Sequence, residues 1–336
     1  MQKNWIGEYM IRIILAVLAA AALFMIIVMV IDNHRFVVRN YTVRSPKILL
    51  PLKIVFIADL HEKDFGADNE KLVARIREER PDVILIGGDL IVSGQVGKVR
   101  RKAERARGQG AEDGIDPSWM KNSLTLVKNL VQICPVWFVQ GNHEIRLEYY
   151  EELNEYNAIF REEMKKAGVR FIENGRTGPY ELCNDKDYGV NLHGLVLPVR
   201  YYKKFTKNEL PSDELENLIG KADEDRFTVL LTHTPVYFEQ YARWGADLCL
   251  CGHVHGGLMR LPLIGGVMGT RPNLFPKYSG GQYFYTTGEG RRSTLILTCG
   301  LGTHTLPIRI FNPGEISAIT LMPEKAPDTP ARGQHE

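Results

Sequence analysis

The chain has 336 residues, of which 44% are hydrophobic and 24% are charged, and these fractions are those of a globular protein of one large or two ordinary domains. A formal net charge of +2 gives no indication of a nucleic-acid partner, and none is predicted. Five cysteines without a Cys-x-x-Cys pair exclude a disulfide framework as the expected organisation.

The first element in chain order is an apolar segment, residues 13–31, that contains no charged residue and no proline. A helix of this length matches a hydrocarbon core about 30 Å thick, so we predict one membrane-spanning anchor behind a short flank, residues 1–12. A cleaved signal peptide and a buried core helix are the alternatives. The apolar part of a signal peptide is shorter, about 7–15 residues, and no small-residue cleavage site follows Ile31.

The charges beside this segment bear on its orientation. Lys3 and Arg12 precede it, and more basic residues follow it: Arg35, Arg39, Arg44 and Lys47. Basic residues favour the cytoplasmic side, although large domains cross membranes largely regardless of them. We therefore predict a single-pass protein of the cell membrane with its catalytic domain on the cytoplasmic face.

After the anchor, short apolar strands alternate with helical patterns. Residues 32–48 are expected to connect the anchor to the domain and to contain a first strand over 35–44. Further strands are predicted at 53–58, 83–86, 136–139, 227–231 and 246–250. This alternation predicts an α/β domain over 49–322, with largely parallel strands and ligands beyond their carboxyl ends.

Less regular parts of the domain carry their own predictions. A long helix is expected over 147–166. Segments around 283–285, 295–297 and 308–310 are expected to form antiparallel strands that complete a second sheet. Residues 323–336 are rich in Pro, Gly and charge, so we predict a disordered tail.

Five of the predicted strands end in Asp, Asn or His: Asp59 with His61, Asp89, Asn142 with His143, His233, and His253 with His255. One Asp after a strand is more often a turn residue or helix cap, but five such ends use five of the nine histidines. Carboxylate, amide and imidazole donors suit Mn²⁺, Fe²⁺, Zn²⁺ or Ni²⁺ and suit Ca²⁺ poorly. The donors are too many for one closed zinc site, so two divalent metal ions are predicted, with Mn²⁺ ranked first.

The order Asp-x-His, Gly-Gly-Asp, Gly-Asn-His, Thr-His and Gly-His-x-His resembles that of the calcineurin-like metallophosphoesterases. The resemblance covers essentially the whole chain after the anchor. It implies a two-sheet β-sandwich flanked by helices, with four layers in the order α/β/β/α. The anchor and the segments 252–262, 300–303, 306–309 and 311–313 are similar to the membrane-anchored bacterial branch, whose relatives include UDP-2,3-diacylglucosamine pyrophosphohydrolases.

The resemblance also implies roles for these residues: Asp59, His61 and His255 hold one metal, Asn142, His233 and His253 hold the other, and Asp89 bridges both. A water shared by the metals would be acidified to a pKa of about 7 and would attack phosphorus as hydroxide. His143 would protonate the leaving oxygen. Glu144 stands where many members have Asp, and we expect it to alter the support of His143 without removing a ligand.

Substrate contacts are less sharply indicated. A polar insert, residues 93–117, follows Asp89 closely and contains six basic residues: Lys98, Arg100, Arg101, Lys102, Arg105 and Arg107. It is either a solvated loop or a loop that attracts anionic lipid headgroups or polyphosphate, with Arg100 and Arg101 as candidate contacts. Tyr201, Tyr202 and Lys203 are expected to be exposed, either as a second wall of the substrate site or as ordinary surface. His193 and His304 belong to no motif and are interpreted as structural.

Three classes of function remain. The favoured one is a membrane-tethered phosphohydrolase that cleaves a phosphoester or pyrophosphate in a lipid-linked or nucleotide-sugar substrate such as UDP-2,3-diacylglucosamine. The second is a phosphodiesterase or phosphomonoesterase for soluble substrates. The third is an inactive metal-binding scaffold, against which the complete ligand set together with His143 argues. No protein partner is predicted.

Overall fold

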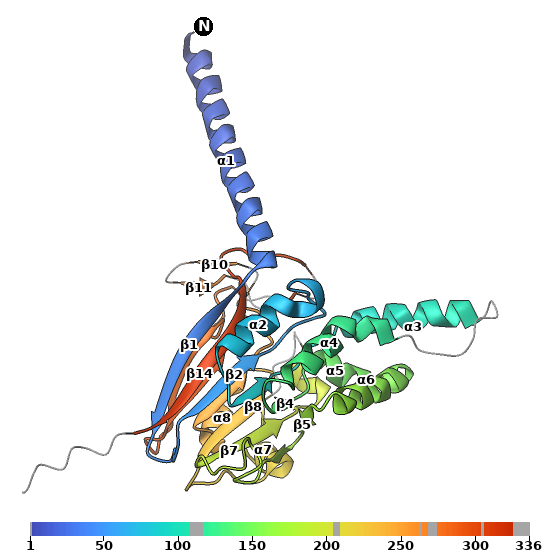
Figure 1. Cartoon of the computed structure of the whole chain (residues 1–336). Helices are drawn as coiled ribbons and strands as arrows, with labels where there is room; N and C mark the ends of the chain where they lie inside the picture. The colour runs from blue at the N-terminus through green and yellow to red at the C-terminus, as the bar shows by residue number, and fades with distance from the viewer. Residues whose placement is uncertain are drawn as a thin grey trace, which may run out of the picture.

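The computed structural model describes residues 2–107, 117–203, 209–257, 259–261, 264–267, 274–303 and 306–324. Helix α1 (Gln2–His34) projects from one end of a body built from two sheets with helices on their outer faces (Figure 1). Within α1, the segment Gly7–His34 contains an 18-residue window with a mean hydropathy of 3.2, and none of that window is buried. The predicted apolar helix is therefore present, and its length and composition fit a membrane span or a signal sequence.

The first sheet has the order β1-β14-β2-β3-β4-β5. Its strands are β1 (Phe36–Ser45), β14 (Gly314–Pro323), β2 (Leu52–Ile57), β3 (Val83–Ile86), β4 (Val136–Phe138) and β5 (Arg170–Phe171). Strands β2 to β5 are parallel, whereas β14 runs antiparallel to β2 and parallel to β1. β14, the most C-terminal strand among the described residues, thus lies between β1 and β2, the two strands that follow α1.

The second sheet has the order β12-β13-β9-β8-β7-β6. Its strands are β12 (Gly281–Thr286), β13 (Arg292–Leu297), β9 (Leu248–Cys251), β8 (Phe227–Thr232), β7 (Val190–Leu195) and β6 (Gly175–Arg176). The prediction of antiparallel strands at its C-terminal end was partly wrong. β13 pairs antiparallel with β12 but parallel with β9, and residues 308–310 contribute one bridge, from Ile310 to Met259, instead of a strand.

Alternation along the strands divides the core into layers. On β2, Ile54 and Phe56 pack in the cluster between the sheets, while Val55 and Ile57 pack in the cluster beneath the helices of the first sheet. Those helices are α2 (Glu70–Glu78), α4 (Lys121–Leu130) and α6 (Asn154–Lys166), and the second sheet is covered by α7 (Ser212–Ile219) and α8 (Phe238–Trp244). The mixed α/β fold that the alternation predicts is confirmed.

Two predicted elements differ from the structure. The helix expected over 147–166 is divided, because Tyr150 adopts an extended backbone between α5 (Asn142–Tyr149) and α6. The insert expected to be a loop begins as helix α3 (Ser93–Arg107), which extends away from the sheets (Figure 1). Its second half consists of strong helix formers, and Arg100 pairs with Glu104 one turn later at 2.6 Å. Residues 108–116 of the insert and 325–336 of the predicted tail lie outside the described residues.

Candidate metal centre

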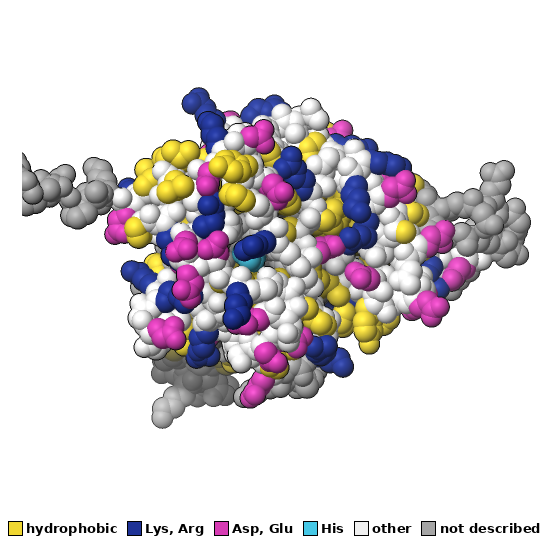
Figure 2. Space-filling view, turned by 90° about the horizontal axis from the view of Figure 1, so that it is seen from below, with side chains coloured by type: hydrophobic (Ala, Val, Ile, Leu, Met, Phe, Trp, Pro, Cys, Tyr) yellow, Lys and Arg dark blue, Asp and Glu magenta, His cyan; other side chains and the backbone are white. Residues whose placement is uncertain are grey.

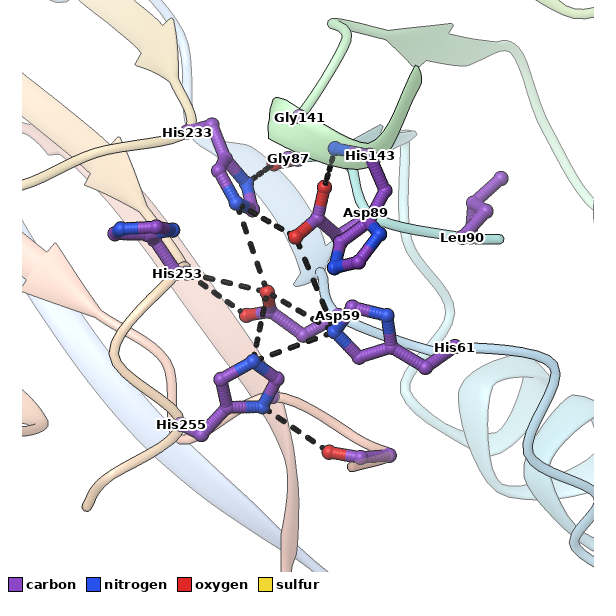
Figure 3. Close-up of polar contacts among 12 residues, drawn as sticks. Asp59, His61, Gly87, Asp89, Leu90, Gly141, His143, His233, His253 and His255 are labelled. Atoms are coloured by element: carbon purple, nitrogen blue, oxygen red, sulfur yellow. Dashed lines mark hydrogen bonds and ion pairs between the residues drawn. The ribbon is translucent and has the colours of Figure 1, made fainter. Parts of the chain in front are cut away.

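The five polar strand ends meet at one edge of the two sheets (Figure 3). β2 leads to Asp59 and His61, β3 to Asp89, β4 to Asn142 and His143, β8 to His233, and β9 to His253 and His255. Parallel strands deliver their carboxyl ends to the same side of a sheet, and here both sheets do so next to each other. Side chains separated by nearly 200 residues in sequence therefore face one point.

The backbone at this edge is unusual. The φ angles of five residues at the site are positive: Asp59 55°, His61 48°, Asp89 54°, His253 73° and His255 52°. His253 and His255, which follow the predicted strand 246–250, both turn through the left-handed region. Such conformations cost about 1 kcal/mol or more each and persist where the surrounding structure enforces them.

One group of side chains consists of Asp59, His61 and His255, whose ligand atoms all lie within 4.8 Å of one another. His61 Nε2 is 3.3 Å from His255 Nε2, and Asp59 Oδ1 is 3.9 Å and 3.6 Å from these two nitrogens. The opposite nitrogens face carbonyl oxygens: Nδ1 of His61 faces Ile91 O at 3.2 Å, and Nδ1 of His255 faces Gly302 O at 3.1 Å. Protons on both Nδ1 atoms direct both Nε2 lone pairs to the centre.

A second group consists of Asp89, His233 and His253. His233 Nε2 is 3.0 Å from Asp89 Oδ2, and its Nδ1 faces Gly87 O at 2.7 Å. Asp89 also belongs to a group with His61 and His143, with His61 Nε2 3.9 Å from its Oδ2. Asp89 therefore lies between the two groups.

The residues fit divalent cations on two observations. Two Nε2 lone pairs at 3.3 Å repel each other unless a proton or cation lies between them. Asn142 Oδ1 is buried at the same edge and accepts no hydrogen bond from the described residues. A buried oxygen without a donor is costly, and coordination of a metal would satisfy it.

Glycine provides clearance at two of the strand ends. A Cβ on Gly252 would stand 2.6 Å from Asp59 Oδ2, and a Cβ on Gly88 would overlap the backbone of Gly141. The loops of Gly-Gly-Asp, Gly-Asn-His and Gly-His-x-His thus pack so closely that a side chain has no room.

Burial and the surrounding charges raise the pKa of some carboxylates and histidines of the site and lower that of others. Burial raises the pKa of Asp59 to about 7. Burial also opposes ionisation of Asp89, but the attraction of His233 and His143 outweighs it and holds the pKa of Asp89 well below its usual value. Burial lowers the pKa of His253 far below 6.5, while Asp89 raises that of His233 to about 9. Bound cations would favour the ionised form of both carboxylates.

The tautomer of His143 follows from its neighbours. The backbone N–H of Ser93 donates to His143 Nδ1 at 3.0 Å, so the proton of the neutral ring lies on Nε2. The backbone N–H of His143 donates to Asp89 Oδ1 at 2.8 Å. The imidazole ring lies 5.0 Å from that of His61, edge to face. The sequence indicated no role for Ser93, because it lies in the insert and in no motif.

Glu144 supports the Asp89 loop instead of His143, contrary to expectation. Its carboxylate accepts hydrogen bonds from four backbone N–H groups: Asp89 at 2.9 Å, Leu90 at 2.8 Å, Ile91 at 3.3 Å and Gly141 at 2.9 Å. The carboxylate is fully buried, and burial raises its pKa to about 7. It links two of the five strand ends.

The proposed substrate residues are distributed differently from the prediction. Tyr201 and Tyr202 are buried, at 4% and 8% exposure, so the prediction of an exposed wall was wrong for both. Tyr202 packs 5.4 Å from the ring of His253, whereas Lys203 is exposed at the surface. Arg100 and Arg101 lie on α3, two turns beyond Ser93, and no contact joins either to the ligand groups among the described residues.

The segment after β13 holds the last strand end in place. Asn312 donates through Nδ2 to His255 O at 2.7 Å and to Gly257 O at 2.8 Å. Its backbone N–H donates to Asp32 Oδ2 at 2.8 Å, and Asp32 is a buried residue of α1. Arg309, 2% exposed, donates to Gly302 O at 2.7 Å, the carbonyl that His255 Nδ1 faces. No motif in the sequence indicated these roles beyond the resemblance of the segment.

A sequence model described as "Calcineurin-like phosphoesterase" matches residues 52–257, which is more than half of the chain and includes all five strand ends. The chain belongs to the calcineurin-like phosphoesterase family. This membership confirms the predicted superfamily and makes the chain a hydrolase of phosphoester bonds, with a phosphorylated substrate. The family and the Asp and His groups together indicate divalent metal binding.

Several curated proteins are similar to this phosphoesterase. YpbG of Bacillus subtilis is 25% identical over 81% of both chains. YaeI of Escherichia coli, named a phosphodiesterase, is 26% identical over 74% of this chain and 79% of its own. The metallophosphoesterase Cj0846 of Campylobacter jejuni is 23% identical over 86% of this chain and 64% of its own length.

Solved structures are similar at lower identity. NAD nucleotidase (NadN) of Haemophilus influenzae is 13% identical with a TM-score of 0.41, over 75% of this chain and 45% of that chain. A dimetal phosphatase of Danio rerio is 12% identical with a TM-score of 0.35, over 74% of this chain and 87% of that chain.

Proposed function

We propose that this phosphoesterase is a membrane-anchored dinuclear metallohydrolase that cleaves a phosphoester or pyrophosphate bond in a lipid-linked or nucleotide-sugar substrate such as UDP-2,3-diacylglucosamine. The observation that carries the proposal is the position of Asp89 between two groups of metal-ligating side chains (Figure 3). The strand register puts these groups at the end of the first sheet from which α1 leads.

One metal is assigned to Asp59, His61 and His255, the other to Asn142, His233 and His253, and Asp89 bridges them. The distances among these groups and the unsatisfied Oδ1 of Asn142 support the assignment. Mn²⁺ is our first choice, and Fe²⁺, Zn²⁺ and Ni²⁺ suit the same donors. When bound, such a pair of ions supplies Lewis acidity to the phosphoryl oxygens and lowers the pKa of water.

His143 is assigned as the general acid. The backbone N–H of Ser93 donates to its Nδ1, so Nε2 carries the proton that would pass to the leaving oxygen of the substrate. The bond from the backbone N–H of His143 to Asp89 ties the position of the ring to that carboxylate. The chain thus orients the imidazole through Nδ1 and through its backbone.

Residues 13–31 of α1 are assigned as the membrane span, preceded by the flank 1–12 and followed by the connection 32–48 and the catalytic domain 49–322. The register of the first sheet supports a site close to the membrane. Phe36, two residues after α1, pairs with Gly314, and Phe56, at the end of β2, pairs with Ser317. Asp59 therefore lies at the same end of the sheet as the anchor, and the basic residues after the span favour the cytoplasmic face.

The activity is tested with bis-p-nitrophenyl phosphate and Mn²⁺. We expect wild type to hydrolyse it, Asp89→Asn to lose activity, and His143→Ala to lose about 10²–10⁴-fold because the general acid is missing. Asp68→Asn, an exposed carboxylate outside the site, is the matched control. Undiminished hydrolysis in both Asp89→Asn and His143→Ala would refute the mechanism.

The substrate class needs a panel that contains UDP-2,3-diacylglucosamine, the same nucleotide sugar without acyl chains, and soluble phosphodiesters. Preference for the acylated substrate in vesicles supports the proposal. The alternative is a phosphodiesterase or phosphomonoesterase for soluble substrates, which the name of the relative YaeI favours, and equal rates with and without acyl chains would select it.

A further inference from the structure

Several short segments form a platform around the base of α1. They are 259–261, 264–267, 274–275 and 306–311, and they include β10 (Arg260–Leu261) and β11 (Gly265–Gly266), which lie beside the end of α1 in Figure 1. Backbone contacts join them: Met259 bridges to Ile310, Val267 N–H donates to Met259 O at 2.9 Å, and Phe275 N–H donates to Val267 O at 2.9 Å. The platform is thus one continuous surface.

The platform contacts the C-terminal part of the apolar helix. Asn33 Nδ2 donates to Pro307 O at 2.6 Å, and the ring of Phe311 lies 6.3 Å from that of Phe24. Phe24 is seven residues before Ile31, which corresponds to about 10 Å along a helix. Phe311 therefore lies beside the apolar span itself, above the level at which the span ends.

The outer side chains of the platform are large, apolar and exposed. Their exposed fractions are Ile264 62%, Leu274 64%, Phe275 55%, Leu306 51% and Phe311 40%. Single exposed apolar residues are ordinary, but a contiguous group of them marks a binding surface. The face turned away from α1 carries Lys and Arg interspersed with Asp and Glu, together with groups of hydrophobic side chains (Figure 2).

Basic residues border this apolar group. A groove of about 540 Å³ is lined by Ile264 and Phe311 together with Arg260 and Lys277. Apolar side chains beside Lys and Arg match the boundary between acyl chains and anionic headgroups. The contact between Phe311 and Phe24 sets the depth of that boundary on the platform.

We propose that the platform inserts into the acyl region of the membrane leaflet that α1 enters, as a second membrane contact of the catalytic domain. The inference rests on the anchor assigned under the proposed function. Lipid acyl chains are the occupant, because the platform continues the surface of a helix that is itself apolar and exposed. Insertion by about 5–10 Å would fix the orientation of the domain and hold the metal centre at the lipid surface.

The test uses the full chain in phosphatidylcholine and phosphatidylglycerol vesicles, with an environment-sensitive fluorophore on one introduced cysteine and spin-labelled lipids as quencher. Ile264→Cys and Phe275→Cys report the platform, and Leu18→Cys reports the anchor. Leu49→Cys is the matched control, since Leu49 is 58% exposed and precedes the end of β2 remote from Asp59. The unaltered chain measures labelling of Cys134, which is half-buried.

We expect a blue shift and loss of emission at 264 and 275, as at position 18, and neither at position 49. Quenching at 18 without quenching at 264 and 275 would overturn the platform and leave the anchor intact. Absence of quenching at position 18 would contradict the proposed membrane anchor, and the platform proposal that rests on it would fall as well. A disulfide between Phe275→Cys of two chains, without quenching, would assign the platform to a second copy and also overturn the inference. Hydrolysis of bis-p-nitrophenyl phosphate shows whether each cysteine variant is folded. If Phe275→Cys is inactive, Leu274→Cys takes its place.

Discussion

At the scale of single residues, the metal centre depends on side chains that bind backbone. The loop of Asp89 has a positive φ and three successive N–H groups that point to one carboxylate, that of Glu144. Such a loop holds its shape only while the buried acceptor is present. The strained backbone at Asp89 is therefore stabilised by Glu144, which is not itself one of the proposed metal ligands.

Glu144→Gln should destabilise the protein by about 1–3 kcal/mol, because an amide NH₂ would face backbone N–H donors in a buried place. We also expect weaker metal binding, since the Asp89 loop loses its acceptor. Urea unfolding and Mn²⁺ titration measure both effects. Glu148→Gln, exposed on the same helix α5, is the control, and equal behaviour of the two variants would contradict this role of Glu144.

His193 gives a prediction about pH. Burial lowers its pKa to about 4, so between about pH 6.5 and 4 the unfolded chain binds a proton that the folded chain does not. Stability therefore falls as pH falls, by on the order of 2 kcal/mol between pH 7.5 and 5 from this group. His193→Phe should flatten that part of the fall in urea unfolding midpoints. Parallel pH profiles for the variant and wild type would rule the contribution out.

At the scale of elements, the end of α1 and the loop after β9 share one partner. The backbone N–H of Asn312 donates to the carboxylate of Asp32, and its side-chain amide donates to the carbonyl oxygens of His255 and Gly257. Helix α1 and the loop after β9 are therefore joined through Asn312. A substitution of Asn312 should therefore alter the position of His255 although no metal ligand is replaced.

Asn312→Ala should lower metal affinity by about 10-fold or more, because the loop of His255 loses two hydrogen bonds that orient it. Isothermal titration with Mn²⁺ measures this. Asn33→Ala is matched to it, since Asn33 also joins α1 to the same segment through Pro307 O but does not contact the His255 loop. Similar losses in both variants would show that attachment of α1 in general, and not Asn312, supports the site.

At the scale of the whole molecule, the metal centre ties the two sheets together. Asp59, Asp89 and Asn142 come from the first sheet, and His233 and His253 from the second. Ions bound between them would act as cross-links of the folded state only. Metal content should therefore control global stability.

Mn²⁺ should raise the melting temperature, with a stabilisation of about 2.7 kcal/mol at 100 times the dissociation constant, and chelation should reverse it. Asp89→Asn should abolish most of the rise, because the bridging carboxylate is lost. Differential scanning fluorimetry with and without EDTA measures these shifts. Asp68→Asn should respond as wild type does, and an unchanged Mn²⁺ response in Asp89→Asn would contradict the bridging role.

The strand ends were predictable from sequence because each lies within a few residues of an apolar run, where local pattern decides the element. Helix α3 was missed because it has few apolar residues and hence no clear periodicity. The burial of Tyr202 and the contacts of Ser93, Arg309 and Asn312 depend on segments far apart in the chain. No local pattern reports such contacts, and the same reason explains why β14 was assigned to no place in the first sheet.

The position of β14 has a consequence for synthesis of the chain. β1 emerges from the ribosome directly after α1, yet it is an edge strand whose partner, β14, is made about 270 residues later. Until then its backbone groups have no strand to pair with, and the first sheet cannot close. Helix α1 is therefore made long before the first sheet is complete, and β1 gains its partner only after β14 has been made.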